Sequence, residues 1–176
     1  YWFMMIAYKL FGVSAFAARF FSAFFGVLTI ISTYHFTKKF IHKRIAAITV
    51  FVLCSAIFFM QEFHLAVPDP YLIFFVTFAL FSFYDFYKNQ KKSSWLLFYV
   101  ALGLGVLAKG PVAIALPGLI ILIFLLMKKD FNWKTIKKIN PFLGGILTLA
   151  ISVPWFYLVH KATNGAYTEG FFLQHN

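Results

Sequence analysis

One lysine stands inside a long apolar run, where a charged side chain is unexpected. Lys109 lies in LAKGPVAIALP, residues 107–117, within a run from Trp95 to Met127 that is otherwise almost wholly apolar. A charge at that depth is tolerated where it faces protein or a water-filled cavity, and there an ammonium group can hold an anion. The alternative is a lysine that extends from a helix end to the membrane interface.

The sharpest acid of the sequence is Asp69, which lies between two prolines in QEFHLAVPDPYLIFF, residues 61–75. Proline restricts the backbone on both sides, so the carboxylate has few directions open to it. We expect Asp69 to cap a helix that begins at Pro70, and a cap exposed to a cavity can also accept a proton during catalysis. Other candidates for lining a cavity or holding an acceptor are Glu62, His64, Trp155 and His175.

The composition indicates the class of protein in which these residues act. Hydrophobic residues make up 62% of the 176 residues, and charged residues only 12%. A water-soluble domain of this size would lack the polar surface to cover itself, so the chain is predicted to be an integral membrane protein. The net charge of +11 then marks cytoplasmic loops and is no sign of a nucleic-acid partner. The single cysteine, Cys54, excludes an internal disulfide framework.

The apolar segments predict an all-α bundle of about six transmembrane crossings in a single membrane domain. A helix over 95–127 would be about 50 Å long against a hydrocarbon core of about 30 Å, so we interpret this run as a hairpin that turns at 108–111. The polar tract 128–138 is expected to be a cytoplasmic loop or surface helix, and 1–11 an interfacial helix at the outer surface, ended by Gly12. Ser14 is expected to cap the next helix, and the remaining crossings are predicted over 14–36, 45–61, 70–87 and 139–159.

The basic clusters fix the sidedness of this arrangement. Three groups of Lys and Arg follow the crossings near residues 38–44, 88–92 and 128–138, and the positive-inside rule places all of them in the cytoplasm. Arg19, Asp69 and Lys109 then fall on the outer side, which favours binding of an anion at the outer leaflet, such as a lipid phosphate. The sequence has no HxxxH or CxxC metal motif and no glycine-rich phosphate loop.

Four stretches resemble the bacterial members of the protein O-mannosyltransferase and aminoarabinose transferase superfamily, which are glycosyltransferases of the GT-C type. They are YW with LFGVSAFAARFFSAFFG, VPDPYLIFF, LGLGVLAKGPVAIALP, and VPWFYLVHKATNGAYTEGFFLQHN. The resemblance implies transfer of a sugar from a polyprenyl-phosphate donor to a lipid A, glycan or protein acceptor, at the outer (periplasmic) face of the bacterial inner membrane. It implies that Asp69 is the second acidic position of the active site and that Lys109 and Arg19 bind the donor phosphate.

The same resemblance predicts that the chain is part of a longer enzyme. In the family, an Asp-Glu pair in the first outer loop comes before the YW at which this sequence starts. We therefore expect residues 1–176 to be a fragment that lacks the first transmembrane helix and the C-terminal part, and to be inactive alone. No cofactor is predicted with certainty, and use of a divalent metal stays open. A transporter or flippase for a lipid-linked anion is the alternative function, and a purely structural membrane subunit is a third.

Overall fold

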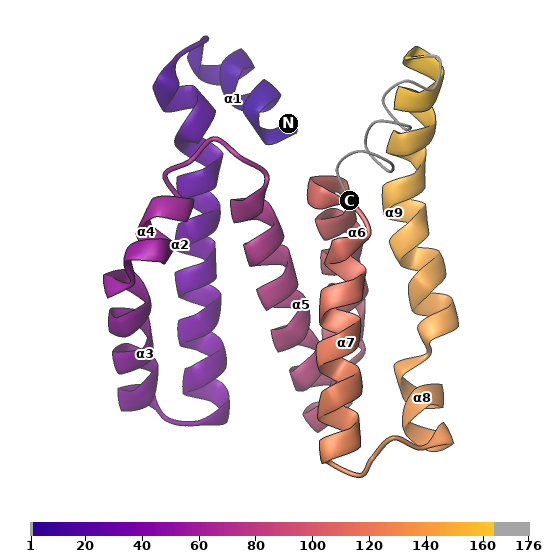
Figure 1. Cartoon of the computed structure of the whole chain (residues 1–176). Helices are drawn as coiled ribbons and strands as arrows, with labels where there is room; N and C mark the ends of the chain where they lie inside the picture. Colours follow the sequence, from indigo (N-terminus) through magenta and orange to yellow (C-terminus); the bar gives the residue numbers. More distant parts are fainter. Residues whose placement is uncertain (1, 164–176) are drawn as a thin grey trace. The chain divides into compact units, whose positions relative to one another are not determined.

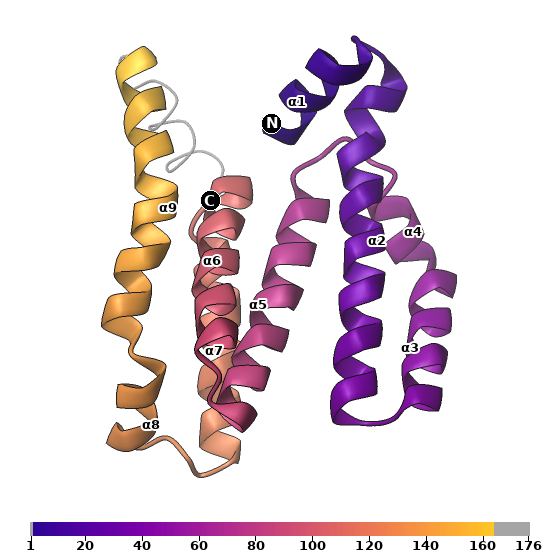
Figure 2. The same ribbon diagram turned by 180° about the vertical axis from the view of Figure 1, so that it is seen from behind.

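The computed structural model describes residues 2–163, which form nine α-helices and no β-strand. The all-α prediction is thereby confirmed. Figures 1 and 2 show the helices from opposite sides. In chain order they are α1 (Trp2–Phe11), α2 (Ala15–Phe40), α3 (Lys43–Ser55), α4 (Ile57–Glu62), α5 (Asp69–Asn89), α6 (Lys92–Lys109), α7 (Val112–Met127), α8 (Trp133–Ile139) and α9 (Pro141–Ala162).

Three helical stretches within residues 2–163 are long and apolar enough to cross a membrane, and α7 is a shorter apolar helix. The three are α2, α5 and the stretch Trp133–Ala162, which joins α8 to α9. They correspond to the predicted crossings 14–36, 70–87 and 139–159. The total of about six crossings stays a prediction.

The chain divides into two compact units, residues 1–77 and residue 78 onward. In the first unit α1 and α3 both pack on α2. The hydroxyl of Ser14 accepts a hydrogen bond from the backbone N–H of Ala17 (3.2 Å), so the predicted cap of α2 is confirmed. Gly12, at φ 77°, follows the last residue of α1, as expected.

The predicted crossing over 45–61 is wrong as a single helix. The helix breaks at Ala56, whose extended backbone (φ −72°, ψ 116°) separates α3 from the six residues of α4. Just before the break, the hydroxyl of Ser55 donates to the carbonyl of Val52 (2.9 Å), a local bond that competes with the helical pattern. This break was not predictable from the sequence, because neither glycine nor proline stands at this point.

The predicted hairpin over 95–127 is confirmed within the second unit. Helix α6 ends at Lys109, Gly110 takes a φ of 78° with ψ −154°, and α7 begins at Val112 and packs back along α6 (Figure 1). A residue with a side chain rarely adopts that backbone conformation, so glycine is needed there. The polar tract after α7 contains the short helix α8, in agreement with the predicted loop or surface helix.

Helices α6 and α9 approach closely because small residues lie between them. A Cβ built on Gly144 would lie 2.0 Å from the ring of Tyr99, and one on Gly103 would lie 3.0 Å from Ile151. The hydroxyl of Thr148 also donates to the carbonyl of Tyr99 across this contact (3.2 Å). Small residues at such a contact let two membrane helices pack without a hydrophobic driving force between them. Tyr99 belongs to the buried core formed by Ala79, Phe83, Phe98, Tyr99, Ala101 and Leu102.

Candidate functional site

Asp69 is the first residue of α5, and its side chain is half-buried. The N–H of Leu72 donates to the carbonyl of Pro68 (3.2 Å), so Pro68 is where the helical bonding starts. The helix therefore begins one residue earlier than expected, and Asp69 lies in its first turn instead of capping it.

Aromatic side chains surround the first turns of α5 in the first unit. The ring of Tyr71 lies 5.0 Å from Phe3 and 5.3 Å from Phe25, measured between ring centroids. The hydroxyls of Tyr71 and Ser22 are buried and make no hydrogen bond within the part of the chain that the structure describes. Tyr71 lies two residues after Asp69 in α5, whereas Ser22 belongs to α2, and the two buried hydroxyls lie close to one another.

The other candidates of the first unit lie in three different places. Arg19 is in the second turn of α2 and is exposed, Glu62 ends α4 and is half-buried, and His64 is exposed in the turn that follows. The Nδ1 atom of His64 makes a hydrogen bond with the carbonyl of Met60, in its own turn of chain. This local bond orients the imidazole, and the role of His64 in lining a cavity stays a prediction.

Lys109 and Trp155 belong to the second unit. Lys109 is the last residue of α6, half-buried beside the turn at Gly110, and Trp155 is half-buried in α9. Since Asp69 and Arg19 lie in the other unit, their assembly with Lys109 around one cavity stays a prediction. His175 lies outside the described residues. Among residues 2–163, no group of three or more His, Cys, Asp or Glu side chains is placed to hold a metal ion.

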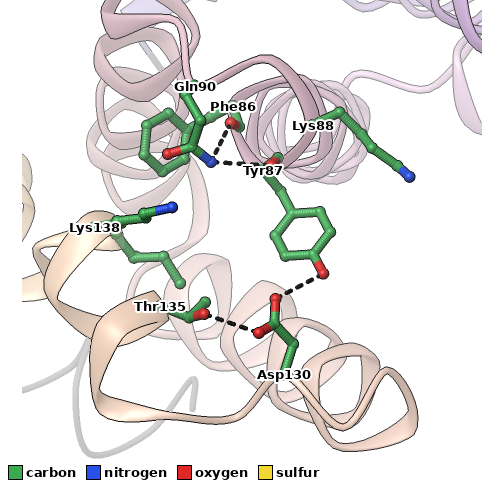
Figure 3. Close-up of a pocket in the computed structure, with 8 residues that line it drawn as sticks. Phe86, Tyr87, Lys88, Gln90, Asp130, Thr135 and Lys138 are labelled. Carbon is green, nitrogen blue, oxygen red and sulfur yellow. Dashed lines mark hydrogen bonds between the residues drawn. The ribbon is translucent and has the colours of Figure 1, made fainter.

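The structure reveals a polar cluster that the sequence did not predict, at the end of the second unit where α5 ends and α8 begins (Figure 3). The hydroxyl of Tyr87 donates to a carboxylate oxygen of Asp130 (2.8 Å), and the hydroxyl of Thr135 donates to the other oxygen (3.2 Å). The hydrogen bond from Tyr87 is the main reason why the pKa of Asp130 lies below its ordinary value. These residues, with Lys88 and Lys138, line a hollow of about 220 Å³.

No sequence signal reveals this cluster, because Tyr87 and Asp130 are 43 residues apart. The cluster ties the end of α5 to the connection between α7 and α8. It is also the part of the second unit that carries the basic residues assigned to the cytoplasm, so it lies at the opposite end of the α6–α7 hairpin from Lys109. Within this unit it is therefore separate from Lys109.

Comparison with known proteins decides the family. A family model described as dolichyl-phosphate-mannose-protein mannosyltransferase matches residues 1–158. The chain belongs to this family. Relatives to which the chain is similar include an uncharacterized protein of Aquifex aeolicus, 32% identical over 92% of this chain and 32% of that protein. Another is the undecaprenyl phosphate-alpha-4-amino-4-deoxy-L-arabinose arabinosyl transferase of Erwinia tasmaniensis, 27% identical over 99% of this chain and 32% of that protein.

Solved structures agree with this assignment. The crystal structure of ArnT from Cupriavidus metallidurans bound to undecaprenyl phosphate matches with a TM-score of 0.89 and 28% identity, over 99% of this chain and 33% of that one. The apo structure of the same protein matches with a TM-score of 0.88. The chain is thus a multi-pass membrane protein of a glycosyltransferase family. It spans about a third of the length of these relatives.

Proposed function

We propose that residues 1–176 form one transmembrane domain of a longer glycosyltransferase, which moves a sugar from a polyprenyl-phosphate donor to an acceptor hydroxyl or amine. The observation that carries the proposal is the match, over 99% of the chain, to a crystal structure bound to undecaprenyl phosphate. The acceptor class proposed is lipid A, another glycan or a protein. In this proposal the protein lies in the bacterial inner membrane, and its active site opens on the periplasmic side.

The chemistry needs a base and a cation, and the chain offers both. For a hydroxyl acceptor, its oxygen attacks the anomeric carbon while the bond from that carbon to the phosphate oxygen breaks. The polyprenyl phosphate leaves with the electron pair, and the acceptor proton passes to a carboxylate. In this proposal Asp69 takes or orients that proton, whereas Lys109 and Arg19 stabilise the negative charge that grows on the phosphate.

Three features of the described residues support these roles. Asp69 stands in the first turn of a membrane helix and between two prolines, which restrict the directions open to its carboxylate. Lys109 is the last residue of α6, and Gly110 after it adopts a backbone conformation that suits glycine. This fixed turn restricts the positions that the ammonium group of Lys109 can reach. Arg19 is exposed on its helix, so its guanidinium remains available for a phosphate. In this proposal Glu62 and Trp155 line the part of the active-site cavity that binds the acceptor.

The test is a transfer assay on the full-length protein in membranes, with several polyprenyl-phosphate sugars supplied in turn. Asp69→Asn and Lys109→Ala should each reduce turnover at least about tenfold, as expected when a general base or a charge-stabilising group is lost. Asp85→Asn is the matched control, since Asp85 lies in the same helix and accepts hydrogen bonds from Ser94 and Asn89 that an asparagine oxygen can in part replace. Near-normal transfer by Asp69→Asn or Lys109→Ala would remove that residue from the mechanism.

A further inference from the structure

A second hollow lies beside the polar cluster of Figure 3 and shares Phe86 and Lys138 with it. It has a volume of about 440 Å³, within the range in which small organic molecules bind. Its residues come from the end of α5, the start of α6, α8 and the start of α9. They are Phe86, Lys92, Trp95, Leu96, Lys137, Lys138, Asn140 and Leu143.

The charged part of this lining has one sign. Lys92, Lys137 and Lys138 are all exposed, and no carboxylate is part of the lining. Asp130 interacts with one of these lysines: its pKa lies below the ordinary value chiefly because Tyr87 donates a hydrogen bond to it, and to a smaller extent because of the positive charge of Lys138. The oxygens of Asp130 already accept hydrogen bonds from Tyr87 and Thr135. Three ammonium groups around one hollow therefore leave a net positive charge that an anion would neutralise.

The rest of the lining is apolar, and its frame is fixed by hydrogen bonds. Phe86, Trp95, Leu96 and Leu143 form an apolar wall, and Leu96 and Leu143 are exposed. The indole N–H of Trp95 and the hydroxyl of Tyr99 both donate to the carbonyl of Ile139, at 2.7 Å and 3.1 Å. These bonds hold the junction of α8 and α9 against α6, so the hollow is built by packed helices.

We propose that this hollow binds the phosphate headgroup of an anionic phospholipid from the membrane leaflet that it faces. The three lysines would pair with the negatively charged phosphate, and the exposed leucines would contact the first carbons of the acyl chains. The charged and the apolar parts of the lining thus fit the headgroup and the tails of one lipid. Basic pockets at the ends of membrane helices bind anionic headgroups in this way. A free phosphate would use the lysines alone and leave the apolar wall in water.

The experiment is a lipid titration of the purified full-length protein, delipidated in detergent and followed by native mass spectrometry. Phosphatidylglycerol should bind at least about tenfold more tightly than phosphatidylcholine with the same acyl chains. In the triple variant K92Q/K137Q/K138Q the affinity for phosphatidylglycerol should fall about a hundredfold, since one lysine near the membrane surface contributes about fivefold. The variant K92R/K137R/K138R should retain the preference because it keeps the charge.

A second triple variant, K38Q/K39Q/K43Q, is the matched control, because it removes the same charge from the end of α2 and the start of α3, and none of these lysines lines either hollow. It should bind phosphatidylglycerol as the wild type does. Equal affinity for the two lipids, an equal loss in the two glutamine variants, or binding of glycerol 3-phosphate as tight as that of the lipid would each overturn the proposal. If the first glutamine variant fails to fold, the comparison of the two lipids on the wild type and the arginine variant still decides.

Discussion

Replacing Gly144 by alanine tests the close contact between α6 and α9. The added Cβ would lie 2.0, 2.2 and 2.3 Å from three ring atoms of Tyr99, distances at which carbon atoms cannot coexist. Moving the ring is difficult, because it packs 4.9 Å from Trp95 and 4.6 Å from Phe98 between ring centroids, and its hydroxyl donates to the carbonyl of Ile139. Either the ring or the helix α9 must shift.

The size of the effect follows from these contacts. Overpacking a fitted core costs about 1–3 kcal/mol, and loss of the hydrogen bond from Tyr99 costs about 1 kcal/mol more. Gly145→Ala is the matched control, because a Cβ there meets nothing within 4 Å. Both substitutions gain the same helix propensity, so the difference between them isolates the clash at about 2–4 kcal/mol.

Thermal unfolding of the two variants in the same detergent is the measurement, with Gly144→Ala expected to melt well below Gly145→Ala. A double-mutant cycle with Tyr99→Ala tests whether the loss of stability comes from the contact between Gly144 and Tyr99. Once the ring is removed, Gly144→Ala should cost little stability. Equal melting temperatures for the two alanine variants would refute the packing of α9 on α6. A Gly144→Ala effect that persists without the tyrosine ring would locate the clash elsewhere.

Three further predictions follow from local features. Ser14→Ala should lower the stability of the first unit by about 1 kcal/mol, since the cap of α2 is lost, and chemical denaturation should show no such loss for Ser55→Ala. Gly110→Ala should cost about 1–3 kcal/mol in thermal unfolding because its φ of 78° with ψ −154° suits glycine alone, whereas Gly118→Ala, in open space, should not destabilise. Tyr87→Phe should raise the pKa of Asp130 toward its ordinary value, because the hydrogen bond from Tyr87 is lost. In the wild type that pKa is lowered in the folded state. The stabilisation of the fold by this hydrogen bond is therefore present above the ordinary carboxyl pKa and is lost as the pH falls through the lowered pKa. The stability difference between Tyr87→Phe and wild type should therefore vanish in strong acid, and a difference independent of pH would contradict this.

Features set by neighbouring residues were predictable from the sequence. The cap at Ser14 and the turn at Gly110 depend on residue types within a few positions, and both are present in the structure. The hairpin followed from the length of the apolar run and from the positions of the lysines around it. The start of α5 was misplaced by one residue because the carbonyl of Pro68 accepts the first helical bond, and a sequence pattern rarely fixes a helix end more closely.

Features set by distant residues were not predictable. The contact of Tyr99 with Gly144 and the bond of Tyr87 to Asp130 join residues more than 40 positions apart, and neither leaves a periodic or spaced motif. The same holds for the hollow between α6, α8 and α9, whose lysines appear in the sequence only as members of cytoplasmic basic clusters. Sequence reasoning named Asp69, Arg19 and Lys109 individually, but a local sequence pattern does not show how side chains from three separate helices are brought together.

In the proposed enzyme, one end of α6 contributes to stability and the other end carries Lys109, the proposed phosphate-binding residue. At one end, Trp95 and Tyr99 bond to the carbonyl of Ile139, and Gly144 lets α9 pack against the same turns. At the other end, α6 finishes at Lys109 and the chain turns through Gly110. In the proposed enzyme, the close packing at the first end fixes the axis of α6. The direction of this axis determines where the ammonium group of Lys109 lies at the other end. A shift of α6 caused at Gly144 should therefore displace Lys109 although the two are far apart in the chain, and a 1 Å misplacement of a catalytic group is enough to reduce a rate by about a hundredfold.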